Sequence, residues 1–201
     1  MSDSRPGRAL LLLDLQDGTC RFDGEIGRHG IGAQVAERGV LAAAARSLAA
    51  AREHDVPVAY ARLAFDDAYA TLASRAPRVR AMREAGLGLA SSSGSAICRE
   101  VAPRAGEPVV AKVGIDPLIG TPLLPILNAA GARELAVAGV ATNHVVESAA
   151  RHAADLGFSV VILEDACAAQ TAELHRLAVE GTLPFYADIT SVDEYVAELG
   201  G

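Results

Sequence analysis

Six apolar runs recur along the chain, and longer stretches with a helical pattern separate them. The runs show almost no polar alternation, which is typical of strands that are buried on both faces of a sheet. Each gap is long enough for a helix that returns the chain to a parallel neighbouring strand. The runs cover residues 9–14, 56–63, 108–113, 134–140, 158–165 and, more weakly, 184–189. They predict a doubly wound, three-layer α/β/α sandwich around a parallel sheet of about six strands.

The stretches between the runs are rich in alanine and leucine and predict helices. Within them, His152 is expected to be structural and His175 to be partly exposed. A less regular segment, 64–107, is expected to carry a short helix at about 76–85 and a loop over one sheet edge. The other expected helices cover residues 33–54, 120–131, 143–156, 171–181 and 191–199. Two glycines stand where helix C-caps are expected: Gly131 and Gly157.

Length and charge narrow the classes of function. The chain has 201 residues, below the length at which chains divide, so we expect one domain over residues 1–201. A net charge of −7 argues against nucleic-acid and anionic-membrane partners. The first apolar run is too short for a signal peptide or a membrane span. Three scattered cysteines suit a reducing compartment. We therefore expect a cytoplasmic protein that acts on a small molecule.

Two charged residues end predicted strands. Asp14 closes the first, and Lys112, the only lysine in the sequence, closes the third. The carboxyl ends of parallel strands meet at one edge of the sheet, where doubly wound folds bind their ligands. A lysine beside a carboxylate in a desolvated cleft favours the charged form of both. The simpler alternatives are a turn cap for Asp14 and a charge-balancing salt bridge for Lys112.

The stretch 139–158 predicts a strand, a tight turn and a helix. Thr142 or Asn143 could cap the helix. The free N–H groups at 141–145 would then point into the cleft and form a site for an anion. His144 could act as a general base there or face a subunit interface. The alternative is a plain strand-to-helix connection, of which such folds have several.

These motifs together resemble the isochorismatase-like cysteine hydrolases. They are D-L-Q at 14–16, Lys112 followed by G-T at 120–121, and G-V-A-T at 139–142, in that order. The resemblance spans essentially the whole chain. It implies the six-stranded α/β/α fold, hydrolysis of an amide C–N or enol-ether bond in a small molecule, and a homodimer or homotetramer.

The resemblance also implies a catalytic triad of Asp, Lys and Cys. Asp14 and Lys112 match the first two, but Val145 stands where the family has its nucleophilic cysteine. Thioester chemistry cannot run at a valine. The family's isochorismatases have glycine there and use no covalent intermediate, which implies acid–base chemistry by Asp14 instead. Cys20 is a less favoured substitute nucleophile. The remaining cysteines are expected to be buried apolar residues: Cys98 and Cys167.

Other positions complete the predicted site. Arg62, at the end of the second strand, could hold a substrate carboxylate bidentately or lie on the surface. The resemblance implies a cis peptide before Ala141. Asp66 and Asp67 are a weak metal signal, so we predict neither a metal nor a cofactor. The residues predicted to bind substrate are Gln16, Arg62, Ala141, Thr142 and His144.

Two classes of function stay open beside a thiol enzyme that would use a displaced cysteine such as Cys20. The first is an enzyme that works through Asp14 and Lys112 without a cysteine. The second is an inactive relative that binds a small molecule or builds an oligomer. Val145 favours the second class, whereas the retention of both Asp14 and Lys112 favours the first.

Overall fold

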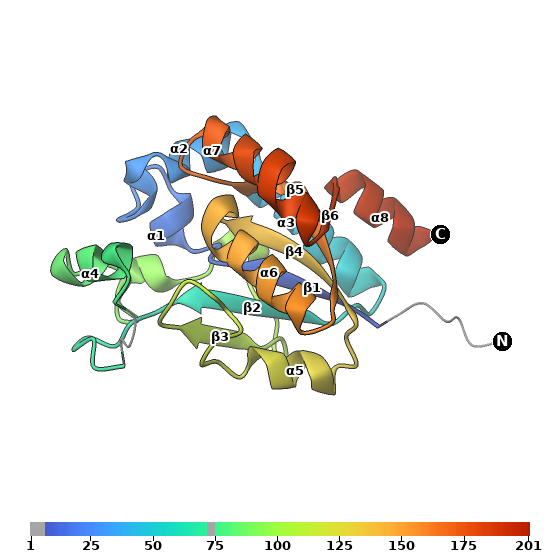
Figure 1. Cartoon of the computed structure of the whole chain (residues 1–201), viewed down its shortest axis with the longest axis horizontal. Coiled ribbons are helices and arrows are strands. Elements are labelled where there is room, and N and C mark those ends of the chain that lie inside the picture. The colour runs from blue at the N-terminus through green and yellow to red at the C-terminus, as the bar shows by residue number, and fades with distance from the viewer. Residues whose placement is uncertain (1–6, 72–74) are drawn as a thin grey trace.

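Six strands pair side by side into one sheet in the computed structural model, which describes residues 7–71 and 75–201 (Figure 1). The order is β3-β2-β1-β4-β5-β6, and every neighbouring pair is parallel. The predicted doubly wound α/β/α sandwich is therefore confirmed. The strands are β1 (Arg8–Leu13), β2 (Val58–Leu63), β3 (Val109–Lys112), β4 (Glu134–Val140), β5 (Ser159–Ala168) and β6 (Asp188–Thr190).

Helices cover both faces of the sheet, and β1 shows why its run of leucines is continuous. Leu10 and Leu12 pack into the apolar cluster on one face, whereas Leu11 and Leu13 pack into the cluster on the other. A central strand buried on both faces needs apolar residues at every position. The first face is covered by α2 (Ile31–Glu37), α3 (Val40–Glu53) and α8 (Val192–Gly200). The second is covered by α5 (Leu123–Ala129) and α6 (Glu147–Asp155).

Several element bounds differ from the prediction. The expected helix over 33–54 is divided, because Gly39 between α2 and α3 adopts a left-handed φ of 67°. The weak run at 184–189 becomes a strand only from Asp188, since a 3₁₀ turn occupies Leu183–Phe185. Gly131 and Gly157 follow their helices with positive φ, as predicted. The remaining helices are α1 (Asp17–Cys20), α4 (Pro77–Glu84) and α7 (Ala172–Leu177), of which α1 was not predicted.

Strand order places a topological switch beside β1. After β1 the chain builds β2 and β3 on one side, and then crosses to β4 on the other side. Because all the strands are parallel, the segments that follow β1, β3 and β4 emerge at the same edge. Doubly wound folds bind ligands at such a point.

Gly139 allows β4 to pass close to β1. It has a φ of 153°, and a Cβ atom there would lie 2.2 Å from the carbonyl oxygen of Leu13. The pairing of β4 with β5 also shifts register between Val137 and Gly139. The following Val140–Ala141 peptide is cis, as the family resemblance implied. The glycine of the G-V-A-T motif thus places the turn after β4 next to the end of β1.

The two ends of the described chain lie at the amino edge of the sheet, opposite the switch point (Figure 1). Arg8 begins β1 at this edge, and its Nη2 donates to Glu198 Oε2 of α8 at 3.2 Å. Within residues 7–71 and 75–201, no helix is both long and apolar enough to cross a membrane.

Candidate active site

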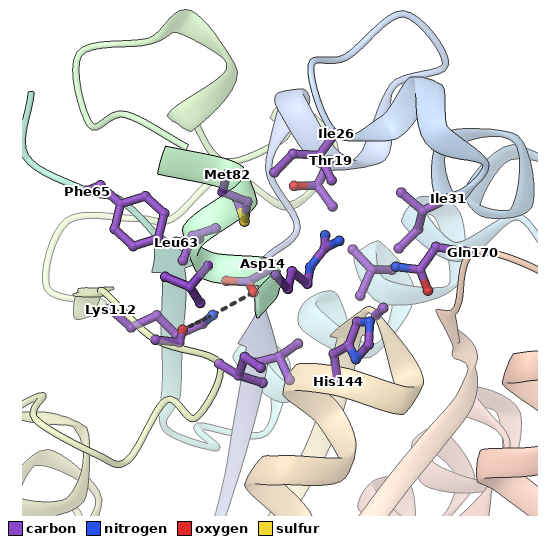
Figure 2. Close-up of a pocket in the computed structure, with 17 residues that line it drawn as sticks. Asp14, Thr19, Ile26, Ile31, Leu63, Phe65, Met82, Lys112, His144 and Gln170 are labelled. Atoms are coloured by element: carbon purple, nitrogen blue, oxygen red, sulfur yellow. Dashed lines mark hydrogen bonds and ion pairs between the residues drawn. The ribbon is translucent and has the colours of Figure 1, made fainter. Parts of the chain in front are cut away.

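Asp14 and Lys112 meet at the carboxyl edge of the sheet, within a pocket (Figure 2). Lys112 Nζ lies 2.8 Å from Asp14 Oδ2 and also donates to the Gly114 carbonyl at 3.0 Å. Only 2% of Lys112 and 8% of Asp14 are exposed. The sequence-predicted juxtaposition is thus present, as a buried ion pair.

The two carboxylate oxygens of Asp14 differ in their contacts. Oδ1 is buried and has no hydrogen-bond partner among the described residues. Burial raises the pKa of Asp14 above its ordinary value of 3.8, whereas the Lys112 ammonium acts in the opposite direction. A carboxylate with a raised pKa is better matched to proton transfer near neutral pH than an ordinary aspartate. Asp14, which lines the pocket, is therefore the candidate proton acceptor of this site.

The pocket is small and has apolar walls. Its cavity volume is about 60 Å³. Phe65, Val79 and Met82 form a separate apolar cluster that packs α4 against the pocket. On the other side of Asp14, Figure 2 shows Ile31, Gln170 and His144. The polar and charged residues of the lining are Asp14, Thr19, Arg78, Lys112, His144 and Gln170.

The turn after β4 forms one wall. Ala141, His144 and Val145 line the pocket, and Val145 is only 1% exposed. Thr142–Val146 forms one wide helical turn. The N–H groups of His144 and Val146 both donate to the Ala141 carbonyl, at 3.1 and 3.3 Å. The anion site expected at 141–145 is therefore smaller than predicted, because the His144 N–H is already used inside the turn.

His144 and Gln170 provide polar groups opposite Lys112 (Figure 2). Burial lowers the pKa of His144, and the nearby Arg78 charge acts in the same direction. A neutral imidazole can accept a proton, so a general-base role stays open for His144. Gln170 Oε1 is buried and has no hydrogen-bond partner among the described residues. The sequence analysis did not single out Gln170.

The match to the isochorismatase domain covers residues 8–194. The chain belongs to the isochorismatase family. The ordered set of weak motifs therefore identified the family correctly.

Individual members of the family differ in how much of the chain they match. The uncharacterised family protein YecD of Escherichia coli is 41% identical over 80 residues, which are 40% of this chain and 43% of YecD. The ureidoacrylate amidohydrolase RutB of Variovorax paradoxus is 29% identical over 201 residues, covering 94% of this chain and 79% of RutB. A cysteine hydrolase from Pseudomonas syringae pv. phaseolicola superposes with a TM-score of 0.83 at 19% identity, over 100% of this chain and 99% of the other.

The cysteines lie outside the pocket that holds the Asp14–Lys112 pair. Cys98 and Cys167 are buried, as predicted, and Cys20 is buried as well. A hydrogen bond with Cys98, together with burial, raises the pKa of Cys20 well above its ordinary value. Burial raises the pKa of Cys167 to about 12. Since the thiolate is the nucleophilic form, the structure gives no support to Cys20 as a substitute nucleophile.

Thr142 and Asn143 do not cap the helix, contrary to the prediction. No side chain makes a capping hydrogen bond at the start of the Thr142–Val146 turn or at the start of α6. Thr142 Oγ1 instead bonds His175 Nδ1 at 2.8 Å. His175 is only 4% exposed, and its Nε2 lies 3.4 Å from Glu164 Oε2. The prediction of a partly exposed His175 is wrong, because its ring is enclosed between the turn after β4 and β5. Thr142 is fully buried and lies outside the pocket lining.

Gln16 and Arg62, both predicted to bind substrate, hold the backbone beside the pocket and do not line it. Gln16 Nε2 donates to the Leu63 carbonyl at 2.9 Å, and its Oε1 accepts the Leu63 N–H at 2.8 Å. Arg62 Nη1 donates to the carbonyl and hydroxyl of Ser95, at 2.9 and 3.0 Å. Both side chains are thus taken up by protein partners.

Asp66 and Asp67 are also bonded to the protein. Asp66 accepts the N–H groups of Ala70 and Thr71 at 2.9 Å each. Asp67 Oδ1 accepts the Ser91 hydroxyl at 2.5 Å. Within residues 7–71 and 75–201, no cluster of three or more histidine, cysteine or acidic side chains could hold a metal ion. His152 lies 3.3 Å from Asp116 Oδ1, consistent with its expected structural role.

Proposed function

We propose that this protein hydrolyses an amide C–N bond in a small molecule and uses water, not a cysteine, as the nucleophile. The observation that carries the proposal is the unpartnered Oδ1 of Asp14, held in the pocket by the ion pair with Lys112. Val145 lies in the wall of the same pocket, where the family resemblance places the nucleophile. RutB, named as an amidohydrolase, supports an amide over an enol ether.

The proposed reaction balances without a covalent enzyme intermediate. Asp14 Oδ1 takes a proton from a bound water as the water oxygen bonds to the amide carbon. The electron pair of the carbonyl moves onto its oxygen, and N–H groups of the turn after β4 stabilise that charge. The C–N bond then breaks, and Asp14 returns the proton to the departing nitrogen. The products are a carboxylic acid and an amine, and Asp14 is again a carboxylate.

In this mechanism Lys112 is the partner that keeps the carboxylate of Asp14 ionised in a buried place. Its ammonium offsets part of the desolvation that raises the Asp14 pKa. It also fixes Oδ2, so that the carboxylate of Asp14 keeps one orientation. The proposal needs no metal or cofactor. We further propose, following the family resemblance, that residues 1–201 form one domain that acts in the cytoplasm as a homodimer or homotetramer.

The test is a screen of the purified protein against small amides, ureas, imides and enol ethers, with Asp14→Asn as the paired control. Amide turnover that disappears in the variant and resists iodoacetamide would support the proposal. Turnover that iodoacetamide abolishes would point to a cysteine nucleophile. Absence of turnover across the panel, in protein shown to be folded by circular dichroism, would favour the inactive binding relative, which Val145 also suggests.

A further inference from the structure

The charges that line the pocket do not cancel. Asp14 and Lys112 neutralise each other as an ion pair. Arg78 is the third ionised side chain of the lining. Among the described residues, Arg78 makes neither an ion pair nor a hydrogen bond. His144 adds little positive charge near neutral pH, because burial lowers its pKa. The ionised side chains of the pocket lining therefore carry a net charge of one positive unit.

Helix α4 fixes where this charge lies. Val79 and Met82 are buried and pack with Phe65, so the helix is anchored by the face next to Arg78. Arg78 itself is exposed and still lines the pocket, which places it at the mouth. Arg80, on the same helix, lies outside the lining, and its Nη1 donates to the Arg75 carbonyl at 3.3 Å. Arg78 therefore places its guanidinium at the mouth of the pocket, whereas Arg80 on the same helix does not.

A second polar group without a partner lines the same cavity. Gln170 lies beside His144 and Ile31, across Asp14 from Lys112 (Figure 2). Its Oε1 is buried and unpartnered among the described residues. A buried amide oxygen without a partner costs free energy unless a bound molecule supplies a donor. The cavity therefore holds three unmatched groups: the Arg78 guanidinium, the Gln170 oxygen and Asp14 Oδ1.

We propose that the substrate is a small monocarboxylate, and that Arg78 binds its carboxylate at the mouth of the pocket. A guanidinium presents two parallel N–H donors that match the two oxygens of a carboxylate. Binding one negative charge would neutralise the pocket. Gln170 would accept a hydrogen bond from the same molecule. The end of that molecule opposite its carboxylate would reach Asp14. Arg78 is therefore a specificity residue. The expectation that the opposite end of the substrate is an amide rests on the proposed function. The binding of the carboxylate by Arg78 does not rest on it.

The test compares two probes of similar shape and different charge, neither of which can be hydrolysed as an amide. Butyrate carries a carboxylate, and 2-pentanone carries a methyl ketone in its place. Their dissociation constants are measured by ligand-observed NMR titration. The proteins compared are wild type, Arg78→Gln, Arg78→Lys and, as a matched control on the same helix, Arg80→Gln. Circular dichroism confirms that each is folded.

We expect wild type and Arg80→Gln to bind butyrate at least about tenfold more tightly than 2-pentanone, which is the effect of one charge-assisted contact. Arg78→Gln should remove this preference by weakening butyrate alone, and Arg78→Lys should restore part of it. The proposal is overturned if Arg78→Gln binds butyrate as wild type does, or if wild type does not prefer butyrate. Arg78-dependent binding without amide turnover would refute the proposed function alone. Turnover without carboxylate preference would refute this inference alone.

Discussion

Lys112 Nζ lies 2.8 Å from Asp14 Oδ2, and the other oxygen of that carboxylate has no partner among the described residues. One oxygen is therefore held by the ammonium, while the other makes no hydrogen bond to the protein. A pair that served only to balance charge would have no need of an unpartnered oxygen on a residue that lines a cavity. This asymmetry is the basis for treating Asp14 as the proton acceptor.

Replacing Asp14 with asparagine should remove the base and keep the shape of the side chain. We expect the rate of amide hydrolysis to fall by about 100- to 10,000-fold, the usual contribution of a general base. Asp17→Asn is the matched control, because Asp17 pairs with Arg21 at 2.8 Å and lies outside the pocket lining. Initial rates at saturating substrate measure the effect. Equal losses in the two variants would contradict the assignment.

Replacing Lys112 with methionine should move the acid limb of the pH–rate profile to higher pH. The Lys112 ammonium lowers the pKa of Asp14, so its removal raises that pKa further. A general base works only when deprotonated, and activity is then lost at a higher pH. Profiles of kcat/KM between pH 4 and 8 report this limb. Arg78→Gln should shift the limb in the same direction by less, so the prediction remains testable if Lys112→Met does not fold. A limb that stays in place in both variants would argue against Asp14 as the base.

Introducing a thiol at position 145 should create a reactive cysteine where the wild type has none. Val145→Cys preserves most of the side-chain volume, so we expect a stability change below about 1.5 kcal/mol. Mass spectrometry after brief iodoacetamide treatment should find label on position 145 in the variant, because that position lines the pocket, and little in wild type, whose cysteines are buried outside the pocket lining. Val145→Ala controls for the change in packing. Rapid labelling of Cys20 in folded wild type would show that the native thiols are more accessible than the structure indicates.

His175 should make the stability of the protein depend on pH. Burial lowers the pKa of His175 below its ordinary value of 6.5. The unfolded chain then binds a proton more readily than the folded one, so stability is full above pH 6.5 and decreases as the pH falls below it. Urea unfolding at pH 7.5 and 5.5 should show a smaller difference for His175→Gln than for wild type. The difference should not vanish, because burial also lowers the pKa of His144.

An exposed histidine supplies the control for this measurement. His54 follows the last residue of α3 and is exposed, so His54→Gln is the control that removes a histidine from the surface. If His54→Gln reduces the dependence as much as His175→Gln does, the effect does not come from the buried ring.

The strand ends were the part of the site that local sequence could predict. Asp14 and Lys112 each follow an apolar run, and parallel strands bring such positions to one edge whatever the helices between them do. The same logic placed Val145 and Ala141 in the pocket. It did not predict the contacts of Arg62, because the partner of its guanidinium, Ser95, comes from a 3₁₀ turn in the less regular segment 64–107.

Residues set by contacts between distant segments escaped the sequence analysis. Threonine is a residue type that often caps helices, but the hydroxyl of Thr142 forms a hydrogen bond with His175, 33 positions away in the chain. Arg78 lies in the short helix expected at about 76–85, but only the packing of Val79 and Met82 on Phe65 brings it to the pocket. Such positions depend on tertiary packing, for which no local pattern exists.

The two ends of the described chain lie at the amino edge of the sheet, where Arg8 and Glu198 meet. The pocket is lined by residues at the carboxyl ends of the strands, at the other edge. A tether joined to either end would therefore leave from the side away from the substrate. Molecules immobilised on a bead or a sensor chip through one terminus would present their pockets outward to the flowing solution. Orientation on a solid support is thus decided by the same strand direction that brings Asp14 and Lys112 to one edge of the sheet.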